Sequence, residues 1–255
     1  MNFPDLAGRV AVVTGGARGL GYSLASALGR QGVAVGLLDL LPEVDASAHR
    51  LSDEYGVASA SAITDVTDPA SVETGFAAVR EALGTPTILI TAAGITIWDE
   101  SAEVSPQTWR KVVDVNLHGT FYSTQAFARP LLAEGGQGSA ILVSSMSGRV
   151  VNVPQHQASY NSSKAAVDQL AKSLAVEWAP AIRVNAIAPG YFLSDLTRQF
   201  TDANPDLAAQ WISLIPAGRM GEPTDLDGLV LLLASSASSY LTGQTLVIDG
   251  GYTAI

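Results

Sequence analysis

The chain has 255 residues, which is enough for one large hydrophobic core, and length alone permits one domain or two. Hydrophobic residues make up 47% of it and charged residues 15%, a balance typical of a compact folded protein rather than a disordered one. The formal net charge of -10 creates a field that repels phosphate backbones and anionic lipids, so we expect neither nucleic acid nor a membrane as a partner.

Two residue types limit the chemistry. The chain has no cysteine, which excludes disulfides, thiolate catalysis and zinc sites built on cysteine ligands. The three histidines, His49, His118 and His156, are scattered without the spacing of a helical metal pair, and we expect no metal. Residues 1–5 lack the basic and apolar stretches of a signal peptide, and no apolar run reaches the roughly 18–20 residues that span a bilayer. We therefore expect a cytoplasmic protein.

Apolar runs of strand length alternate with longer helical patterns along the chain. The expected strands are 9–14, 33–38, 57–63, 87–91, 140–144, 182–187 and 246–248. The expected helices are 19–30, 42–55, 69–83, 106–133, 158–178 and 223–235, two of which have proline early, after Asp68 and Glu222. The strand runs are nearly continuous in Val, Ile, Leu and Ala, as in parallel strands buried on both faces. We predict an α/β fold: one domain, 1–255, with a doubly wound parallel sheet of about seven strands and helices on both faces (a Rossmann fold).

A glycine-rich segment lies between the first strand and the first helix and reads Thr-Gly-Gly-Ala-Arg-Gly-Leu-Gly over 14–21. Glycine permits a tight turn and close backbone approach, and the N-terminus of the next helix presents free N–H groups to a pyrophosphate. We expect cofactor contacts from Gly15, Arg18, Gly19, Leu20 and Gly21. The spacing TGxxxGxG resembles the cofactor loop of the short-chain dehydrogenase/reductase family, a resemblance that implies a nicotinamide cofactor.

Asp39 ends the second expected strand, about twenty residues after the glycine loop, with Leu40 beside it. A carboxylate there can accept hydrogen bonds from the adenosine ribose and would repel a 2′-phosphate, which favours NAD. Arg18 argues for NADP, because a guanidinium in the loop could bind that phosphate. Since Asp39 would lie nearest the 2′ position, we expect NAD rather than NADP.

Three more segments resemble cofactor contacts of the family. Asp65 and Val66 resemble the pair that contacts adenine, although Asp65 could instead cap the turn before the next helix. Thr91 stands where the family usually has asparagine, and its single hydroxyl would have to replace the hydrogen bonds of the amide. Small residues that let the cofactor approach follow it: Ala92, Ala93 and Gly94. The family's PGxxxT segment is matched by Pro189, Gly190, Phe192 and Ser194, of which the last could bind the nicotinamide carboxamide.

Tyr160 and Lys164 are four residues apart, so a helix over 158–178 places them on one face, one turn apart. An ammonium beside a phenol favours the phenolate. The pKa of a tyrosine must fall from about 10 to about 7–8 for work near neutrality, which requires a second positive charge, such as an oxidised nicotinamide ring. Tyr160 could then take a proton from an alcohol or give one to a carbonyl. By resemblance, Lys164 lowers the pKa of Tyr160 and also binds the nicotinamide ribose. An ordinary surface pair is the alternative for the motif alone.

In the family, an asparagine and a serine act together with such a tyrosine and lysine. Asn116 lies inside an expected helix, where asparagine is unfavourable, and in the family it helps to hold a water that links the lysine to solvent. Ser145 ends the fifth expected strand, and its hydroxyl could donate to the substrate oxygen. Ser144 and Ser147 are alternatives, but Ser145 fits best if Gly148 is aligned with the family's SxxG pattern.

The loop 147–155 is about two residues longer than in many family members and resembles that of sugar-alcohol dehydrogenases acting on galactitol, mannitol or arabinitol. Ser147, Asn152 and Tyr191 are candidate substrate contacts, and Gln155 could add a second amide, unless these amides only hold the loop. The resemblance covers essentially the whole chain and implies NAD-dependent oxidation of a sugar alcohol to a ketose.

Segment 191–219 interrupts the alternation with two short amphipathic pieces around 192–200 and 207–214. It predicts either a small substrate lid beside the site or a plain pair of connecting helices.

Other functions remain open. An oxoacyl-thioester reductase, or another ketone or hydroxysteroid reductase, shares the fold and the four residues, but the oxoacyl-thioester enzymes usually need NADPH and a basic patch. A scaffold that senses NAD without turnover is a non-enzymatic alternative, disfavoured because Tyr160 and Lys164 are both present. Family members are usually tetramers or dimers, so we expect a homotetramer or homodimer. The substrate, its stereochemistry, the direction of reaction and a structural metal near the C-terminus are not fixed by the sequence.

Overall fold

A computed structural model of the protein describes residues 2–255, apart from the side chains at positions 195 and 196. Seven parallel strands form one sheet in the order β3-β2-β1-β4-β5-β6-β7. The strands are β1 (Val10–Thr14), β2 (Ala34–Asp39), β3 (Ser59–Ile63), β4 (Ile88–Thr91), β5 (Gly138–Val143), β6 (Ile182–Pro189) and β7 (Thr245–Ile248). All seven predicted strands are present, with ends that differ by a few residues. The order reverses between β1 and β4, as in a doubly wound sheet, so the predicted fold class is confirmed.

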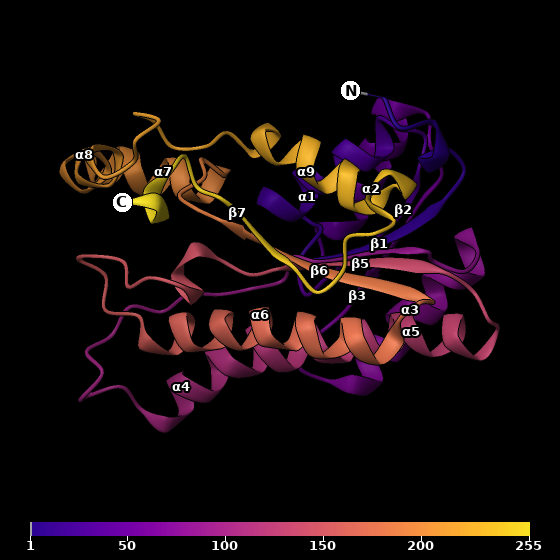
Figure 1. Ribbon diagram of the computed structural model, residues 1–255, viewed down its shortest axis with the longest axis horizontal. Helices are drawn as coiled ribbons and strands as arrows, with labels where there is room; N and C mark the ends of the chain where they lie inside the picture. Colours follow the sequence, from indigo (N-terminus) through magenta and orange to yellow (C-terminus); the bar gives the residue numbers. More distant parts are fainter. Residues whose placement is uncertain (1) are drawn as a thin grey trace.

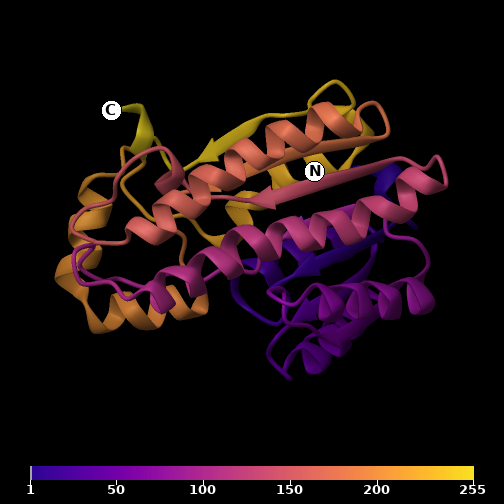
Figure 2. The ribbon, with the colours of Figure 1, turned by 90° about the horizontal axis from the view of Figure 1, so that it is seen from below.

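Helices cover both faces of the sheet (Figure 1). One face carries α1 (Gly19–Gly29), α2 (Val44–Tyr55) and α9 (Asp227–Ala234). The other carries α3 (Pro69–Leu83), α4 (Pro106–Val113), α5 (Gly119–Ala133) and α6 (Ala158–Trp178). Figure 2, seen from that second side, shows α5 and α6 running along the sheet. None of the helices within residues 2–255 is long and apolar enough to cross a membrane.

Two hydrophobic cores follow from the alternation of side chains along the strands. Val13 of β1 packs with Leu24 and Leu28 of α1, whereas its neighbour Val12 packs with Phe127 of α5 on the opposite face. All five side chains are essentially inaccessible to solvent. Each such burial contributes about 1.5–3 kcal/mol, so both helix layers are held firmly to the sheet.

The helix predicted over 106–133 is not continuous. The structure divides it into α4, a π-helical segment Asp114–His118, and α5. Asn116 lies in the wider turn, and its side chain bonds to the backbone of Ile95, a contact across 21 positions of sequence. The wider turn thus coincides with this long-range contact, and π turns inside α-helices are frequent at functional sites.

The two predicted proline helix starts are confirmed. The carboxylate of Asp68 accepts a hydrogen bond from Ala70 N (3.0 Å) at the start of α3. Glu222 and Asp225 form a reciprocal cap at the start of a 3-10 turn, Pro223–Leu226, which continues as α9.

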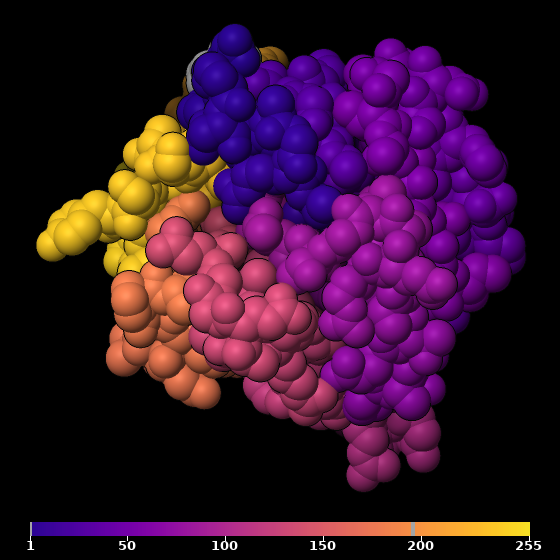
Figure 3. Space-filling model, turned by 90° about the vertical axis from the view of Figure 1, so that its right-hand side faces the viewer, coloured from indigo at the N-terminus to yellow at the C-terminus, as the bar shows by residue number. Residues whose placement is uncertain are grey.

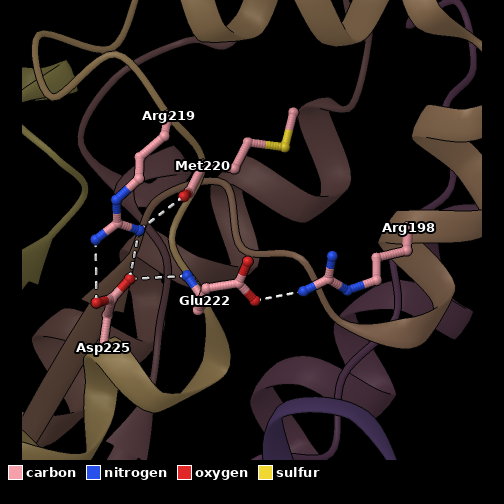
Figure 4. A network of polar contacts seen from close by, with 5 residues as sticks. All are labelled: Arg198, Arg219, Met220, Glu222 and Asp225. Atoms are coloured by element: carbon pink, nitrogen blue, oxygen red, sulfur yellow. Dashed lines mark hydrogen bonds and ion pairs between the residues drawn. The ribbon is translucent and has the colours of Figure 1, made fainter.

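The segment 191–219 forms two short helices, α7 (Asp195–Ala203) and α8 (Pro205–Ser213), beside the C-terminus (Figure 1). They have a small core of their own around Trp211, Ile215 and Met220. Two ion pairs tie the segment to the start of the last helical region (Figure 4). Arg198 binds Glu222, and Arg219 binds Asp225 at 2.7 Å.

The opposite end of the molecule brings the N-terminal, central and C-terminal parts of the chain together (Figure 3). Arg9 donates to Ala234 O (2.7 Å) and Arg183 donates to Ser235 O (3.1 Å), at the C-terminal end of α9. They line a pocket of about 590 Å³. Because both guanidinium groups bind the last carbonyls of a helix, we read this end as structural.

Candidate active site

The register of the sheet aligns the carboxyl ends of its central strands. Thr14 of β1 lies opposite Leu38 of β2 on one side and Thr91 of β4 on the other, and Thr91 lies opposite Leu142 of β5. The glycine loop, Asp39, the Thr91–Gly94 segment and Ser145 therefore emerge at one edge of the sheet. Ligands bind at this edge in doubly wound folds.

The structure brings Asn116, Ser145, Tyr160 and Lys164 together at this edge. A Cβ atom added at Gly94 would lie 3.3 Å from Asn116 Oδ1 and 3.5 Å from Lys164 Nζ, so the Gly94 backbone lies against both side chains. Lys164 Nζ is 5.7 Å from the centre of the Tyr160 ring, and the Ser145 hydroxyl lies close enough to the phenol to act on its pKa. The four side chains thus come from a π segment, the end of β5 and one face of α6.

Lys164 is 4% exposed, and its Nζ donates a hydrogen bond to Val143 O at 2.8 Å. Burial lowers the pKa of Lys164 from 10.5 to about 8, and the Asp168 carboxylate opposes that lowering. The side chain is therefore a buried cation, with its position fixed by the last carbonyl of β5.

Tyr160 departs from the prediction. Burial raises the pKa of Tyr160 above 10.0, and the hydrogen bond with Ser145 opposes the rise. The sequence predicted a lowering by Lys164, which does not act in this structure, because the ammonium lies beside the ring and binds Val143 O. This direction agrees with the expectation that one lysine is insufficient and that a second positive charge is required.

The three neighbouring serines have different surroundings. Ser144 donates to Lys164 O at 2.9 Å and so faces the backbone of α6. Ser145 is 7% exposed, accepts from Ser147 N (3.1 Å) and donates to Ser147 Oγ (3.1 Å). Of the serines considered from sequence, Ser145 is the one whose hydroxyl acts on the pKa of Tyr160. The segment that carries these serines packs closely against α6 at Gly148, where a Cβ would lie 2.7 Å from Ala165 N.

Asn116 has no exposed surface and its amide is fully engaged. Its Oδ1 accepts from Ile95 N (2.8 Å), and its Nδ2 donates to Ile95 O (2.9 Å) and to Ser163 Oγ (3.1 Å). It therefore joins the loop after β4 to the helix that carries Tyr160 and Lys164.

The glycine loop has the geometry of a phosphate cradle. Gly15 has a φ of +68°, and a Cβ there would lie 2.6 Å from Ala93 N, while one at Gly21 would lie 2.0 Å from Gly15 O. Helix α1 begins at Gly19, and its N-cap residue Arg18 provides no side-chain acceptor. Its first N–H groups are thus available to an anion, and these residues fit the pyrophosphate of a dinucleotide.

Asp39 is held beside this loop by two backbone amides. Its Oδ2 accepts from Ala17 N and its Oδ1 accepts from Leu41 N, both at 3.0 Å. The side chain of Leu40, which follows Asp39, is 62% exposed. Arg18 is exposed, and among the described residues it has no hydrogen-bonded or ionic partner. It opens onto a groove of about 630 Å³ between α1 and α2.

Three cofactor-side residues have mainly structural contacts. Asp65 Oδ1 accepts from Thr67 N (2.9 Å) and Thr67 Oγ1 (2.7 Å), which is the turn-capping alternative. Val66 packs against Gly119, where a Cβ would lie 2.7 Å from Val66 Cγ2. Thr91 is 1% exposed, and its hydroxyl has no hydrogen-bond partner, so it does not replace the bonds of an asparagine.

The residues after β6 approach the glycine loop from the other side. A Cβ at Gly19 would lie 3.8 Å from Ser194 Cβ, which places the start of α7 beside the N-terminus of α1. Ser194 Oγ accepts from Thr197 N (3.3 Å) and so caps α7. Pro189 ends β6, Gly190 packs against Asp249, and Phe192 is 6% exposed against Gly221.

A polar network extends from Ser145 toward the α7–α8 segment. Ser147 Oγ donates to Asn152 Oδ1 (2.5 Å), and Asn152 Nδ2 donates to the Tyr191 hydroxyl (3.1 Å). With its amide oxygen toward the indole, Gln155 accepts from Trp211 Nε1 (3.2 Å) and from the Tyr191 hydroxyl (2.9 Å). The three predicted substrate contacts, Ser147, Asn152 and Tyr191, are therefore connected.

Sequence reasoning missed the aromatic wall and one amide of this network. Trp211 stacks on Tyr191 (4.4 Å between centroids, 11°), and Trp98 meets Trp211 edge-on at 6.2 Å. Gln157, 7% exposed, donates to Asn152 Oδ1 at 3.2 Å and accepts from Thr96 Oγ1. A tryptophan in an otherwise polar, amphipathic piece was a usable signal for Trp211. Nothing local marks Trp98, whose partners are distant in sequence.

The described part of the chain contains no cluster of three or more His, Asp or Glu side chains suited to a metal ion.

The profile of a family described as enoyl-(acyl carrier protein) reductase matches residues 15–253. Galactitol 2-dehydrogenase (L-tagatose-forming) of Cereibacter sphaeroides is 41% identical over 97% of this chain and 96% of its own. A probable NADP-dependent mannitol dehydrogenase of Yarrowia lipolytica is 39% identical over 97% of this chain and 88% of its own. The crystal structure of a short-chain type dehydrogenase/reductase from Mycobacterium marinum has a TM-score of 0.93 and 37% identity, over 99% of this chain and 98% of that one.

Proposed function

The chain belongs to the short-chain dehydrogenase/reductase family, and we propose that it oxidises a secondary hydroxyl of a sugar alcohol to a ketose with NAD. The observation that carries the proposal is the continuous polar chain from Ser145 through Ser147 to Asn152, directly beside Tyr160. A substrate with several adjacent hydroxyls can use such a row of hydroxyl and amide groups, whereas a simple alcohol cannot. Galactitol and mannitol in the names of the relatives are substrates of this type.

In the proposed reaction, Tyr160 as phenolate takes the proton of the substrate hydroxyl through its Oη atom. The Ser145 hydroxyl donates a hydrogen bond to the substrate oxygen and so orients it. Lys164 holds a positive charge behind the phenol, and Asn116 fixes the loop at Gly94 against that ammonium. NAD, when bound, supplies the acceptor for the hydride that leaves the substrate carbon.

We propose NAD rather than NADP because of the fixed carboxylate of Asp39. Two amide donors hold its oxygens at the end of β2, so it cannot turn away from a 2′-phosphate without breaking them. Arg18 lies exposed nearby and supports the alternative, as does the NADP in the name of the mannitol relative. We expect Asp39 to decide the cofactor preference, because two backbone amides fix its carboxylate, whereas no partner among the described residues fixes the Arg18 guanidinium.

The α7–α8 segment is proposed as a substrate lid. Tyr191 and Trp98, which is 42% exposed, offer aromatic surface on which the C–H groups of a sugar alcohol can rest. Trp211 is buried between Tyr191 and Phe200 and supports this surface from behind. Arg198 and Arg219 anchor the two ends of the segment through their carboxylate partners (Figure 4).

A cytoplasmic homotetramer or homodimer remains our proposal for the assembled enzyme.

The test is NADH formation by the purified protein across a panel of sugar alcohols, simple secondary alcohols and hydroxysteroids, with NADP and acyl thioesters in parallel. We expect turnover with at least one sugar alcohol and a kcat/KM for NAD well above that for NADP. Activity confined to another alcohol class would refute the substrate, and preference for NADP would refute the role of Asp39.

A further inference from the structure

Asp168 continues the face of α6 that carries the reactive pair. Tyr160, Lys164 and Asp168 are spaced four residues apart, so they lie one above another on successive turns. Asp168 is only 8% exposed, which is unusual for a carboxylate unless it is paired. Its burial needs an explanation.

The contacts of Asp168 satisfy only one of its two oxygens. Arg149 Nε lies 3.4 Å from Oδ2, and the same guanidinium donates to Thr245 O at 3.3 Å. Oδ1 is buried and has no hydrogen-bond partner among the described residues. Leaving a buried acceptor unpaired costs stability, so packing alone does not account for a carboxylate at this position.

Asp168 is the charged group that opposes the lowering of the pKa of Lys164. On the neighbouring elements, the charged side chains bind one another or backbone: Asp114 with His118, Arg129 with Glu73, and Arg183 with carbonyls. The remaining ones are exposed: Arg110 and Lys111 on α4, and Lys172 and Glu177 on α6. Among these charged side chains, Asp168 is the buried one on the face of α6 that carries Lys164, one turn away, and Arg149 is its ion partner.

We propose that Asp168 is a positioning residue that keeps Lys164 protonated during turnover, with Arg149 holding one carboxylate oxygen. Asp168 acts through Lys164 and does not itself meet substrate. The inference rests on the proposed function only for the role of Lys164; the charge relation stands without it.

The direction in which a neutral residue at position 168 shifts the pKa of Lys164 follows from the two opposing effects on that pKa. Burial lowers its pKa to about 8 even with Asp168 present, so removal of the negative charge lowers it further. A lysine that must be protonated then loses its proton at a lower pH. In Asp168→Asn, the alkaline limb of the kcat profile moves down by about one pH unit, and acidic to neutral activity changes less.

The experiment compares the pH profiles of the wild type, Asp168→Asn, Asp168→Ser and Asp168→Glu. Two neutral variants are included so that poor folding of one, judged by its thermal melt, leaves the other. Glu177→Gln, which removes an exposed carboxylate from the same helix, is the matched control and keeps the wild-type profile. We expect both neutral variants to shift and the Glu variant to retain most of the wild-type profile.

A folded neutral variant with an unshifted alkaline limb would overturn the proposal, as would a Glu variant shifted as far as the neutral ones. A second readout is independent of substrate: the pH titration of Lys164 by NMR of lysine labelled with ¹³C at Cε. A lower midpoint for Lys164 in the neutral variant supports the proposal even if sugar alcohols are not the substrate. An unchanged midpoint contradicts it.

Discussion

The carboxylate of Asp39 accepts a hydrogen bond from the backbone N–H of Ala17 at 3.0 Å, and this bond joins the end of β2 to the glycine loop. The same side chain accepts from Leu41 N on its other oxygen. The charge that would select the cofactor is thus part of the loop that would hold the cofactor. Selectivity and local stability are coupled at this residue.

Asp39→Asn keeps the shape of the side chain and removes its charge. We expect kcat/KM for NAD to fall and that for NADP to rise, changing their ratio by about 10-fold or more, because a charge facing a phosphate is worth about 1–2 kcal/mol. Thermal stability should also fall, since the amide keeps only one acceptor oxygen and its NH₂ group faces a backbone N–H, so one of the two hydrogen bonds is lost. Steady-state kinetics with both cofactors measures the ratio. Asp53→Asn, an exposed position on α2, is the control and should leave it unchanged.

Gly15 and Gly56 form a matched pair for the glycine loop. Both have nearly the same left-handed conformation, with φ of +68° and +66°, but a Cβ at Gly15 meets Ala93 N at 2.6 Å, whereas one at Gly56 meets nothing within 4 Å. Gly56→Ala should cost about 1–2 kcal/mol of unfolding free energy and leave NADH affinity intact. Gly15→Ala should cost more and abolish measurable NADH binding. Equal losses in the two variants would show that the close approach to Ala93 is unimportant.

Lys164 is expected to reduce stability while serving function. Its folded-state pKa of about 8 lies below its ordinary value of 10.5, so its protonated form is penalised on folding at neutral pH. The penalty is full below pH 8 and disappears as the pH rises toward 10.5. Lys164→Met should therefore remove activity and make the free energy of unfolding less dependent on pH, since the wild type gains up to about 3 kcal/mol between pH 7 and pH 10 as this penalty disappears. Denaturant unfolding near pH 7 and near pH 10 checks this. The same gain with pH in the variant would contradict it.

The polar network predicts how substrates of different size respond to one change. Asn152→Leu removes the amide that binds Ser147 and Tyr191 while keeping a similar volume. We expect KM for a sugar alcohol to rise about 10- to 100-fold, because unpaired polar groups are left in the site, with little effect on a simple secondary alcohol. Trp211→Ala, which removes the ring that stacks on Tyr191, should also raise KM for the sugar alcohol. A uniform loss with all alcohols would indicate that Asn152 holds the loop and does not recognise substrate.

The sequence predicted most of the fold because each element carries its own signal. Buried strands such as β1 are continuous apolar runs, and the helix start at Asp68 follows from a local cap. The break at Asn116 could not be predicted, since the residues around it have ordinary helical periodicity and the contact of its side chain with Ile95 is distant in sequence. Tertiary contacts decide such details, and single-sequence reasoning does not contain them.

The candidate site divides in the same way. Tyr160, Lys164 and the glycine loop were found because fixed spacings bring their groups together locally. The rise in the pKa of Tyr160 was missed because it depends on burial, which a spacing does not reveal. Asp168 was missed because a carboxylate in the middle of a helix looks solvated until its burial is known. Trp98 and Trp211 meet across 113 positions of sequence, and neither signals the other.

The most direct test of the proposed chemistry is Tyr160→Phe, which removes one hydroxyl and keeps the ring. Its affinity for NADH, measured by fluorescence titration, should stay within a few-fold of the wild type, because the phenol is not part of the glycine loop. Its kcat on the best alcohol of the panel should fall by about 10²- to 10⁴-fold, the usual contribution of a general acid–base group. Turnover at the wild-type rate in this variant would contradict the assignment of Tyr160 as the group that moves the proton.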